Sequence, residues 1–305
     1  MAVQSWMELS DGLAALAEQA SASVVRVDGG RRPSGSGVAW SADTVVTASH
    51  WLDGEEEVEV GLPGGETASA EVAGRDPTTD LAVLRVKGGG LAAAGWSEAP
   101  PRVGGLALAL TRPGRGPRAS LALVSRVGDA FRTHAGGKLD RWVELDVSLF
   151  PGFSGGLVVD LAGRGLGLAT AGVARGTPLA IPPATLRRVV KAILAHGGVR
   201  RGYLGVSSFP VRLPSALAAA AGQRSGLLLT AVEDDSPAAR AGLTVGDVLL
   251  SLDGTAVGHM GDLLPLLEEE RIGDAATARL ARGGGVQELK VTIGVRGQGQ
   301  GGRAP

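Results

Sequence analysis

Short apolar runs dominate the chain between residues 23 and 180, and Gly, Pro or Asp separates each run from the next. Strands of a few residues bounded by turn residues produce this pattern, whereas helices need longer stretches with a period near 3.6. The pattern therefore predicts an all-β barrel or sandwich. The runs are Val24 to Val27, Val58 to Leu62, Leu81 to Val86, Leu106 to Leu110, Ser120 to Val124, Trp142 to Val147 and Leu157 to Asp160.

Two other stretches have helical spacing. Apolar residues between positions 9 and 20 fall on one helix face, so we expect an N-terminal helical segment over residues 1–22. A second helix is expected from about Ala184 to Ala195, opened by two prolines and ended by Gly197. The apolar faces consist of Leu9, Leu13, Leu16 and Ala20 in the first helix and Leu186, Val189, Val190 and Ile193 in the second.

The composition changes near residue 200. All five tryptophans precede a Gly- and Arg-containing segment at 197–202, which we interpret as an interdomain linker. Residues 203–296 mix strand and helix patterns and predict a small α+β domain. Residues 297–305 (G-Q-G-Q-G-G-R-A-P) are expected to be disordered. The expected strands are 226–232, 247–252, 277–281 and 288–293, and the expected helices are 238–241 and 262–270.

Composition narrows the possible chemistry. A chain of 305 residues is long enough for two domains with cores of their own. It has no cysteine, which excludes a thiol nucleophile, a Cys-based zinc site and a disulfide framework. The net charge is −1 and the basic residues are scattered, so no nucleic-acid surface is expected. No cluster of His or carboxylate residues has the spacing of metal ligands, and the glycine runs lack the strand-to-helix context of a phosphate loop. We therefore expect neither a metal nor a cofactor.

The N-terminal segment lacks the features of an export signal. Residues 1–8 contain no basic residue, and no stretch approaches the roughly 18 to 20 apolar residues of a membrane span. We therefore expect a soluble, cytoplasmic protein as the sequence stands, with no membrane span. If the start is truncated, the expectation changes to an exported or periplasmic protein.

The hexamer P-G-F-S-G-G at 151–156 encloses Ser154 between glycines. Glycines weaken strands and helices, so this cluster predicts a turn in which backbone N–H groups approach something closely. Acyl transfer needs such a turn, because a hydroxyl must protrude and nearby N–H groups must face the oxyanion that forms. A serine in a flexible loop would look similar, so the interpretation depends on finding partners for Ser154.

Two residues could activate Ser154. A serine hydroxyl needs a base, commonly a histidine oriented by a carboxylate. His50 follows the strand-like run T-V-V-T-A, and Asp80 directly precedes the apolar run that starts at Leu81. Taken singly, His50 could be an ordinary partly buried residue and Asp80 a turn residue. Together with Ser154 they form a candidate triad.

Three segments resemble, in order and spacing, the triad segments of trypsin-like serine proteases of the HtrA/Deg family. They are T-A-S-H at 47–50, T-D-L-A-V-L at 79–84 and G-F-S-G-G at 152–156. The likeness continues in G-S-G-V at 35–38, L-A-I-P at 179–182 and R-G-Y-L-G-V at 201–206.

That resemblance implies a mainly β fold: a two-barrel, chymotrypsin-like protease domain at 23–196, then a small α+β PDZ domain at 203–296. It also implies His50 as general base, Asp80 as its orienting carboxylate and Ser154 as nucleophile. The N–H groups of Gly152 and Ser154 would form the oxyanion hole.

The second domain resembles a PDZ domain through Y-L-G-V at 203–206, D-S-P-A-A-R-A-G-L at 235–243 and V-G-D-V-L-L-S-L-D-G at 245–254. Such a domain binds an extended C-terminal peptide by strand addition, while backbone amides capture its carboxylate. The peptide-binding residues would be Tyr203, Leu204, Gly205 and Val206. Leu263, Leu264 and Leu267 would line the groove or the core. The resemblance further implies a homotrimer.

Two positions depart from the family pattern. Relatives usually carry Asn where this chain has Phe153, and Asn before the histidine where it has Ser49. Phe153 leaves two outcomes open. Its ring could fill a pocket and fix the nucleophile loop, or it could leave the loop inactive until a partner or substrate reorders it.

We therefore expect a serine endopeptidase of protein quality control that cleaves unfolded or damaged polypeptides and binds peptide C-termini. Ser148 and the uncharged residues 168–171 favour cleavage after medium aliphatic side chains. The alternative is a catalytically weak, protease-fold scaffold or holdase that binds peptide C-termini.

Overall fold

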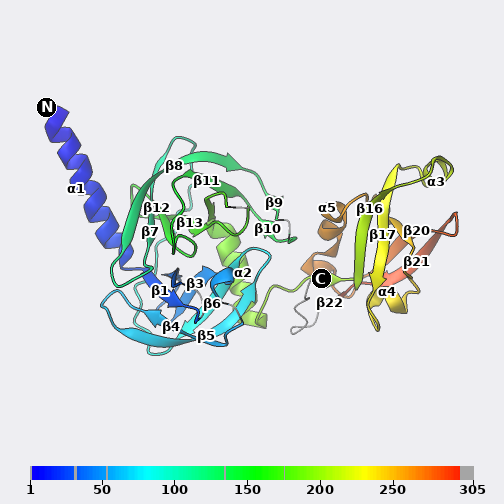
Figure 1. Ribbon diagram of the computed structural model, residues 1–305, viewed down its shortest axis with the longest axis horizontal. Coiled ribbons are helices and arrows are strands. Elements are labelled where there is room, and N and C mark those ends of the chain that lie inside the picture. The colour runs from blue at the N-terminus through cyan, green and yellow to red at the C-terminus, as the bar shows by residue number, and fades with distance from the viewer. Residues whose placement is uncertain (1, 31–32, 53, 134, 175, 296–305) are drawn as a thin grey trace. The chain divides into compact units, whose positions relative to one another are not determined.

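The computed structural model describes residues 2–30, 33–52, 54–133, 135–174 and 176–295 (Figure 1). The chain forms two compact units that divide between residues 199 and 200. The predicted disordered tail at 297–305 lies outside the described residues.

The first unit contains two closed, antiparallel, six-stranded barrels. The strands of the first barrel are β1 (Val24–Asp28), β2 (Gly35–Ala39), β3 (Thr44–Ala48), β4 (Glu57–Gly61), β5 (Thr67–Asp76) and β6 (Leu81–Val86). Those of the second are β7 (Leu106–Thr111), β8 (Arg118–Gly128), β11 (Trp142–Asp146), β12 (Leu157–Asp160), β13 (Gly165–Thr170) and β14 (Leu179–Ile181). The barrels close in the orders β1-β2-β3-β6-β5-β4 and β11-β14-β13-β12-β7-β8. A hairpin of β9 (Phe131–Arg132) and β10 (Lys138–Leu139) extends between β8 and β11. The predicted two-barrel fold is confirmed.

Continuous apolar runs arise because several strands are buried on both faces. On β6, Leu81 and Val83 join a cluster that also contains residues of the second barrel, whereas Ala82 and Leu84 fill the interior of the first. Alternate residues of a strand point to opposite faces, so both sets must be apolar. Burying a Val or Leu side chain completely stabilises the fold by about 1.5 to 3 kcal/mol. The shared cluster thus fixes the two barrels against each other.

Two helices accompany the barrels (Figure 1). In α1 (Ala2–Ser21) the apolar face packs on the shared cluster near its C-terminal end, while Trp6 and Met7 remain exposed. In α2 (Pro183–His196) the four residues expected to face inward are all buried, and Gly197 caps the helix with a left-handed φ of 72°. Both predicted helices are therefore confirmed.

The second unit is a β-sheet with short helices. Its main sheet has the order β16-β17-β18-β20-β21, β19 pairs with β18, and β15 pairs with β22 in a separate ribbon. Its strands are β15 (Gly202–Tyr203), β16 (Val206–Arg212), β17 (Ser225–Val232), β18 (Val248–Leu252), β19 (Thr255–Ala256), β20 (Ala275–Arg282), β21 (Gly285–Thr292) and β22 (Gly294–Val295). Its helices and 3-10 turns are α3 (Ser215–Ala221), α4 (Pro237–Arg240), α5 (Met260–Leu263), η2 (Leu264–Leu267) and η3 (Glu269–Arg271).

The helical predictions for this unit need two corrections. The Ala-rich helix α3 was not predicted. The single helix expected at 262–270 is instead α5 followed by two 3-10 turns. Pro265 has no N–H to donate, and its ring crowds the preceding turn, so a regular α-helix does not continue through it.

Asp247 joins the turn before β18 to β20. Burial by itself raises the pKa of this carboxyl, but the hydrogen bonds from Arg282 and from the Thr244 N–H outweigh it and keep the pKa below its usual value. The Arg282 guanidinium donates to both carboxylate oxygens at 2.7 Å, and the Asp247 side chain is only 1% exposed. A buried carboxylate with these donors remains ionised and holds the two elements together.

Candidate active site

The structure pairs His50 with Asp80. His50 lies in a 3-10 turn, η1 (Ser49–Trp51), directly after β3, and Asp80 directly precedes β6. β3 and β6 are hydrogen-bonded neighbours with Ala48 opposite Leu81, so these two ends are adjacent. The His50 Nδ1 atom lies 2.8 and 2.9 Å from the two Asp80 carboxylate oxygens. An ionised carboxylate only accepts, so Nδ1 carries the proton and Nε2 is left as the basic nitrogen.

Asp80 is held by further donors. The backbone N–H of His50 donates to Oδ1 at 3.1 Å, and the Thr170 hydroxyl donates to Oδ2 at 2.6 Å. The Asp80 side chain is 8% exposed, against 33% for His50. The Asp80 carboxylate is therefore held in place and largely shielded from solvent, whereas the His50 imidazole is partly exposed. Thr170 is the last residue of β13, and the sequence analysis did not propose it as a site residue. The only sequence feature that could have indicated it is a hydroxyl at the end of a strand.

Ser154 lies in the loop between β11 and β12, and the segment after β13 connects it to the pair. The Ala171 N–H donates to the Ser154 hydroxyl at 3.2 Å. A Cβ atom added to the next residue, Gly172, would lie 2.5 Å from Asp80 Oδ2 and 3.0 Å from His50 Nδ1. Only glycine lets the backbone approach the pair this closely. Residues 170–172 thus contact all three members of the candidate triad.

Trp51 makes a second connection. Its ring centroid lies 4.9 Å from that of His50, and its indole N–H donates to the Ser154 carbonyl at 2.9 Å. The structure therefore brings His50 and Asp80 of the first barrel together with Ser154 of the second. Among the described residues, no hydrogen bond joins His50 to Ser154, and the serine hydroxyl accepts from the Ala171 N–H.

The backbone around Ser154 leaves two N–H groups open. The Phe153 N–H donates to Phe150 O at 3.0 Å, and the Gly155 N–H donates to Ala169 O at 2.8 Å. Within the part of the chain that the structure describes, the N–H groups of Gly152 and Ser154 have no acceptor. These are the two donors that the sequence assigned to an oxyanion hole.

Phe153 fills a pocket, as in the first of the two outcomes left open by the sequence. Its side chain is 2% exposed and belongs to the interior cluster of the second barrel. The ring meets Phe150 edge-on with centroids 5.6 Å apart, and the Arg118 guanidinium lies 3.8 Å from the centroid of the Phe150 ring. Stacking of this kind adds about 0.5 to 1.5 kcal/mol to the burial of an aromatic pair. The aromatic side chain thus anchors the loop on the barrel interior.

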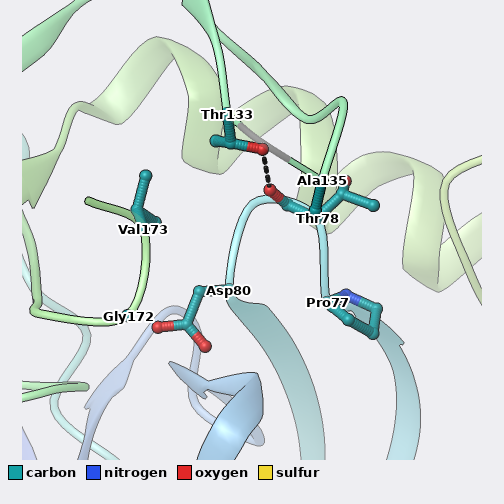
Figure 2. Close-up of a pocket in the computed structure, with 7 residues that line it drawn as sticks. All are labelled: Pro77, Thr78, Asp80, Thr133, Ala135, Gly172 and Val173. Atoms are coloured by element: carbon teal, nitrogen blue, oxygen red, sulfur yellow. Dashed lines mark hydrogen bonds between the residues drawn. The ribbon is translucent and has the colours of Figure 1, made fainter. Parts of the chain in front are cut away.

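A cavity of about 280 Å³ lies beside Asp80 (Figure 2). Its walls come from the turn before β6, the β9–β10 hairpin and the segment after β13, and the Thr133 hydroxyl closes one side by donating to the Thr78 carbonyl at 2.7 Å. Apart from Asp80, the residues that line it carry no charge. They are Pro77, Thr78, Asp80, Thr133, Ala135, Gly172 and Val173.

The loop expected to bind a peptide carboxylate joins β15 to β16. Leu204 is 3% exposed, and its carbonyl and that of Gly205 accept hydrogen bonds from Ala238 and Glu233, each at 2.8 Å. Within the described residues, the N–H groups of Leu204 and Gly205 have no acceptor. β16 follows as the edge strand of its sheet. Open amides beside a free strand edge are what capture of a peptide C-terminus requires.

The helix α5 lies next to this free strand edge. The Ser208 hydroxyl lies 3.2 Å from the Met260 sulfur, which places the start of α5 beside β16. Of the three leucines expected to line a groove or core, Leu263 and Leu267 are buried in the core cluster, and Leu264 is partly exposed.

Neither a metal site nor a membrane-spanning helix is found in the described part of the chain. Its His, Asp and Glu residues form no group of three that could hold a metal ion. None of its helices combines the length and apolar character needed to cross a membrane.

Two family models match the chain. The trypsin-like peptidase domain covers residues 35–168 and the PDZ domain covers residues 202–293. Among solved structures, the HtrA-type protease AlgW with a tripeptide is 30% identical, with a TM-score of 0.69 over 95% of this chain and 99% of that one. The chain belongs to the HtrA family. The family resemblance of its motifs is thereby confirmed.

Other relatives of this HtrA chain carry related names. The probable periplasmic serine endoprotease DegP-like of Brucella suis biovar 1 is 32% identical over 85% of this chain and 52% of its own length. The serine endoprotease DegS of Haemophilus influenzae is 28% identical over 85% of this chain and 76% of its own length. A serine endoprotease structure from Yersinia pestis aligns with a TM-score of 0.70 and 26% identity, over 92% of this chain and 98% of that one. The chain spans about half the length of the first curated relatives it matches.

Proposed function

We propose that this HtrA chain is a serine endopeptidase with Ser154 as nucleophile, His50 as general base and Asp80 as the orienting carboxylate. The observation that carries the proposal is the pairing of His50 Nδ1 with both Asp80 oxygens at 2.8 and 2.9 Å, with Ala171 holding the Ser154 hydroxyl alongside. This arrangement supplies an oriented base and a hydroxyl in one crevice, which are the requirements of acyl transfer.

Catalysis begins when the Ser154 hydroxyl donates a hydrogen bond to His50 Nε2. His50 takes the proton as Ser154 Oγ bonds to the peptide carbonyl carbon, and Asp80 stabilises the imidazolium that forms. The carbonyl oxygen gains negative charge and accepts from the N–H groups of Gly152 and Ser154. His50 then gives its proton to the leaving amine, and water, activated in the same way, hydrolyses the acyl-enzyme.

The substrates we propose are unfolded or damaged polypeptides, in a role in protein quality control. The cavity beside Asp80, whose other lining residues are uncharged, offers room for a neutral substrate side chain. Cleavage after medium aliphatic residues remains our proposal. Relatives named as periplasmic support the export alternative over a cytoplasmic location. We also propose a homotrimer, on the basis of family membership.

The catalytic proposal predicts covalent labelling of Ser154 by a fluorophosphonate. The reagent reacts only with a hydroxyl activated by a base, so wild-type protein should gain one label at Ser154, located by peptide mass spectrometry. Ser154→Ala should gain none, and unfolded casein should be degraded by wild type alone. Ser49→Ala serves as the control, because Ser49 is a neighbouring serine with no assigned step. Absence of labelling and degradation in the wild type would contradict the proposal.

For the second unit we propose capture of peptide C-termini by the loop of Tyr203, Leu204, Gly205 and Val206. The open N–H groups of Leu204 and Gly205 support it. A fluorescent peptide with a free C-terminal carboxylate should bind about 10- to 100-fold more tightly than the same peptide ending in an amide, because hydrogen bonds to a charged acceptor contribute about 1.5 to 3 kcal/mol. Fluorescence anisotropy on the full chain measures both. Equal affinities would contradict carboxylate capture.

One observation favours the alternative of a catalytically weak scaffold or holdase. The Ser154 hydroxyl accepts from Ala171, and within the described residues it makes no hydrogen bond to His50. Under this alternative the wild type fails to label while the C-terminal peptide still binds. Catalytic hydrogen bonds often tighten only when substrate is bound, so labelling in the presence of an unfolded substrate decides between the two.

A further inference from the structure

Ser36, the second residue of β2, directs polar groups toward the loop that carries Ser154. Its side chain is fully buried. The hydroxyl donates to the Gly152 carbonyl at 2.8 Å and accepts the Arg112 N–H at 2.9 Å. The Ser36 backbone N–H donates to the Ser154 carbonyl at 3.4 Å, and its own carbonyl accepts the Thr47 hydroxyl at 2.6 Å. One residue of the first barrel therefore holds the carbonyls on both sides of Phe153.

These bonds fix the orientation of peptide planes. A trans peptide is planar, so its C=O and N–H point in opposite directions. The Gly152–Phe153 peptide is held at one end by the Ser36 hydroxyl and at the other by Phe150 O. Within the described residues, the planes that carry the open N–H groups of Gly152 and Ser154 flank this fixed plane on either side. If the central plane rotated, both N–H groups would turn away from each other.

Arg112 ties Ser36 to the start of the barrels. Arg112 is 4% exposed, and its guanidinium donates to three main-chain carbonyls: Val24 at 2.7 Å, Ser21 at 3.0 Å and Arg115 at 3.1 Å. Burial lowers the pKa of this guanidinium. The end of α1, the start of β1 and the end of β7 thus meet at Arg112, whose side chain binds Ser21 and Val24 and whose backbone N–H donates to Ser36.

We propose that Ser36 and Arg112 are positioning residues that set the oxyanion hole, through a chain of hydrogen bonds from the Ser21 carbonyl to the Gly152 carbonyl. The inference rests on the proposed function for its catalytic consequence. Both residues act through the Gly152–Phe153 peptide, so their role is to position it and not to contact substrate. The anchoring of the chain that follows α1 is thereby coupled to the geometry of the active site.

Amide hydrogen exchange tests this chain of bonds without relying on catalysis. Ser36→Ala should raise the exchange rates of the Phe153 and Gly155 N–H groups at least tenfold, and Arg112→Lys should raise them less. The matched control is Thr111→Val, because Thr111 is also fully buried but its hydroxyl has no hydrogen-bond partner in the described structure. Unchanged exchange at Phe153 in Ser36→Ala would overturn the inference.

Kinetics separate positioning from general damage. With a peptide substrate, Ser36→Ala should lower kcat about 10- to 100-fold, less than the 10²- to 10³-fold loss of an oxyanion donor, while KM changes little. Affinity for a peptide boronic acid should fall in parallel with kcat/KM. If Ser36→Ala does not fold, Ser36→Thr and Ser36→Val give the same comparison, since they share a shape and differ only in the hydroxyl. Equal kcat values for that pair would overturn the inference.

These readouts also distinguish two kinds of failure. A wild type that does not react with fluorophosphonate contradicts the proposed function, while the exchange rates still test the hydrogen-bond chain. A reactive wild type with normal kcat in Ser36→Ala contradicts the positioning role alone.

Discussion

Asp80→Asn is expected to lower kcat by about 10⁴-fold with little change in stability. The carboxylate fixes the proton on His50 Nδ1, leaving Nε2 to accept the Ser154 proton. When the oxygen of an amide at residue 80 keeps the bond from the Thr170 hydroxyl, the NH₂ group takes the place of Oδ1, where it faces Nδ1 and no longer accepts the His50 N–H. The imidazole then adopts the tautomer protonated on Nε2 and cannot act as base.

The measurement is kcat on a peptide substrate, with the melting temperature of each variant as a check on folding. Asp43→Asn is the matched control, because Asp43 precedes β3 at the end opposite His50 and its carboxylate accepts hydrogen bonds from the nearby hydroxyls of Ser41 and Thr44. Its kcat should equal that of wild type. A loss below tenfold in a well-folded Asp80→Asn protein would contradict the assigned role.

Gly155→Ala is expected to destabilise the first unit by about 2 to 5 kcal/mol. Gly155 has a φ of 86°, where an alanine costs about 1 to 2 kcal/mol. Its added Cβ would also overlap the carbonyl oxygen of Ser36 and contact the Thr47 hydroxyl at 3.0 Å. Overpacking against backbone costs a further 1 to 3 kcal/mol or so, because the strand of the other barrel must move.

Gly176→Ala separates the two costs. Gly176 has a similar φ of 82°, but nothing lies within 4 Å of an added Cβ, so only about 1 to 2 kcal/mol should be lost. Urea unfolding of both variants measures the difference. In a unit of this size each kcal/mol lowers the melting temperature by about 2 to 4 °C, so Gly155→Ala should melt about 10 °C below wild type. Equal losses in the two variants would show that close packing at Gly155 contributes nothing.

The sequence predicted those features that depend on local pattern. Apolar runs bounded by turns predicted the strands, and the spacing of Leu186, Val189, Val190 and Ile193 predicted the buried face of α2. His50 and Asp80 could be paired because each adjoins a strand-like run, and those two strands turned out to be neighbours. Periodicity can be detected in the sequence because burial of one face constrains the residue type at every position of a helix or strand.

Individual hydrogen bonds between distant residues were not predicted. Ser36 and Gly152 are 116 positions apart, and no local pattern relates a hydroxyl on one barrel to a carbonyl on the other. The same holds for Thr170 and Asp80, separated by 90 positions. The direction of the Ser154 hydroxyl depends on a single rotamer, which has no signature in the sequence. Phe153 was noticed as a departure, but only the barrel interior shows where its ring packs.

The Arg112 guanidinium forms hydrogen bonds with the backbone carbonyls of residues 21 and 24, and not with their side chains. Every amino acid supplies the same carbonyl oxygen. A substitution at position 21 therefore keeps the hydrogen bond to Arg112, whereas a substitution of Arg112 leaves several backbone carbonyls without their donor. Position 21 should therefore vary among homologues more freely than position 112, whereas position 24 is constrained in addition by its buried side chain.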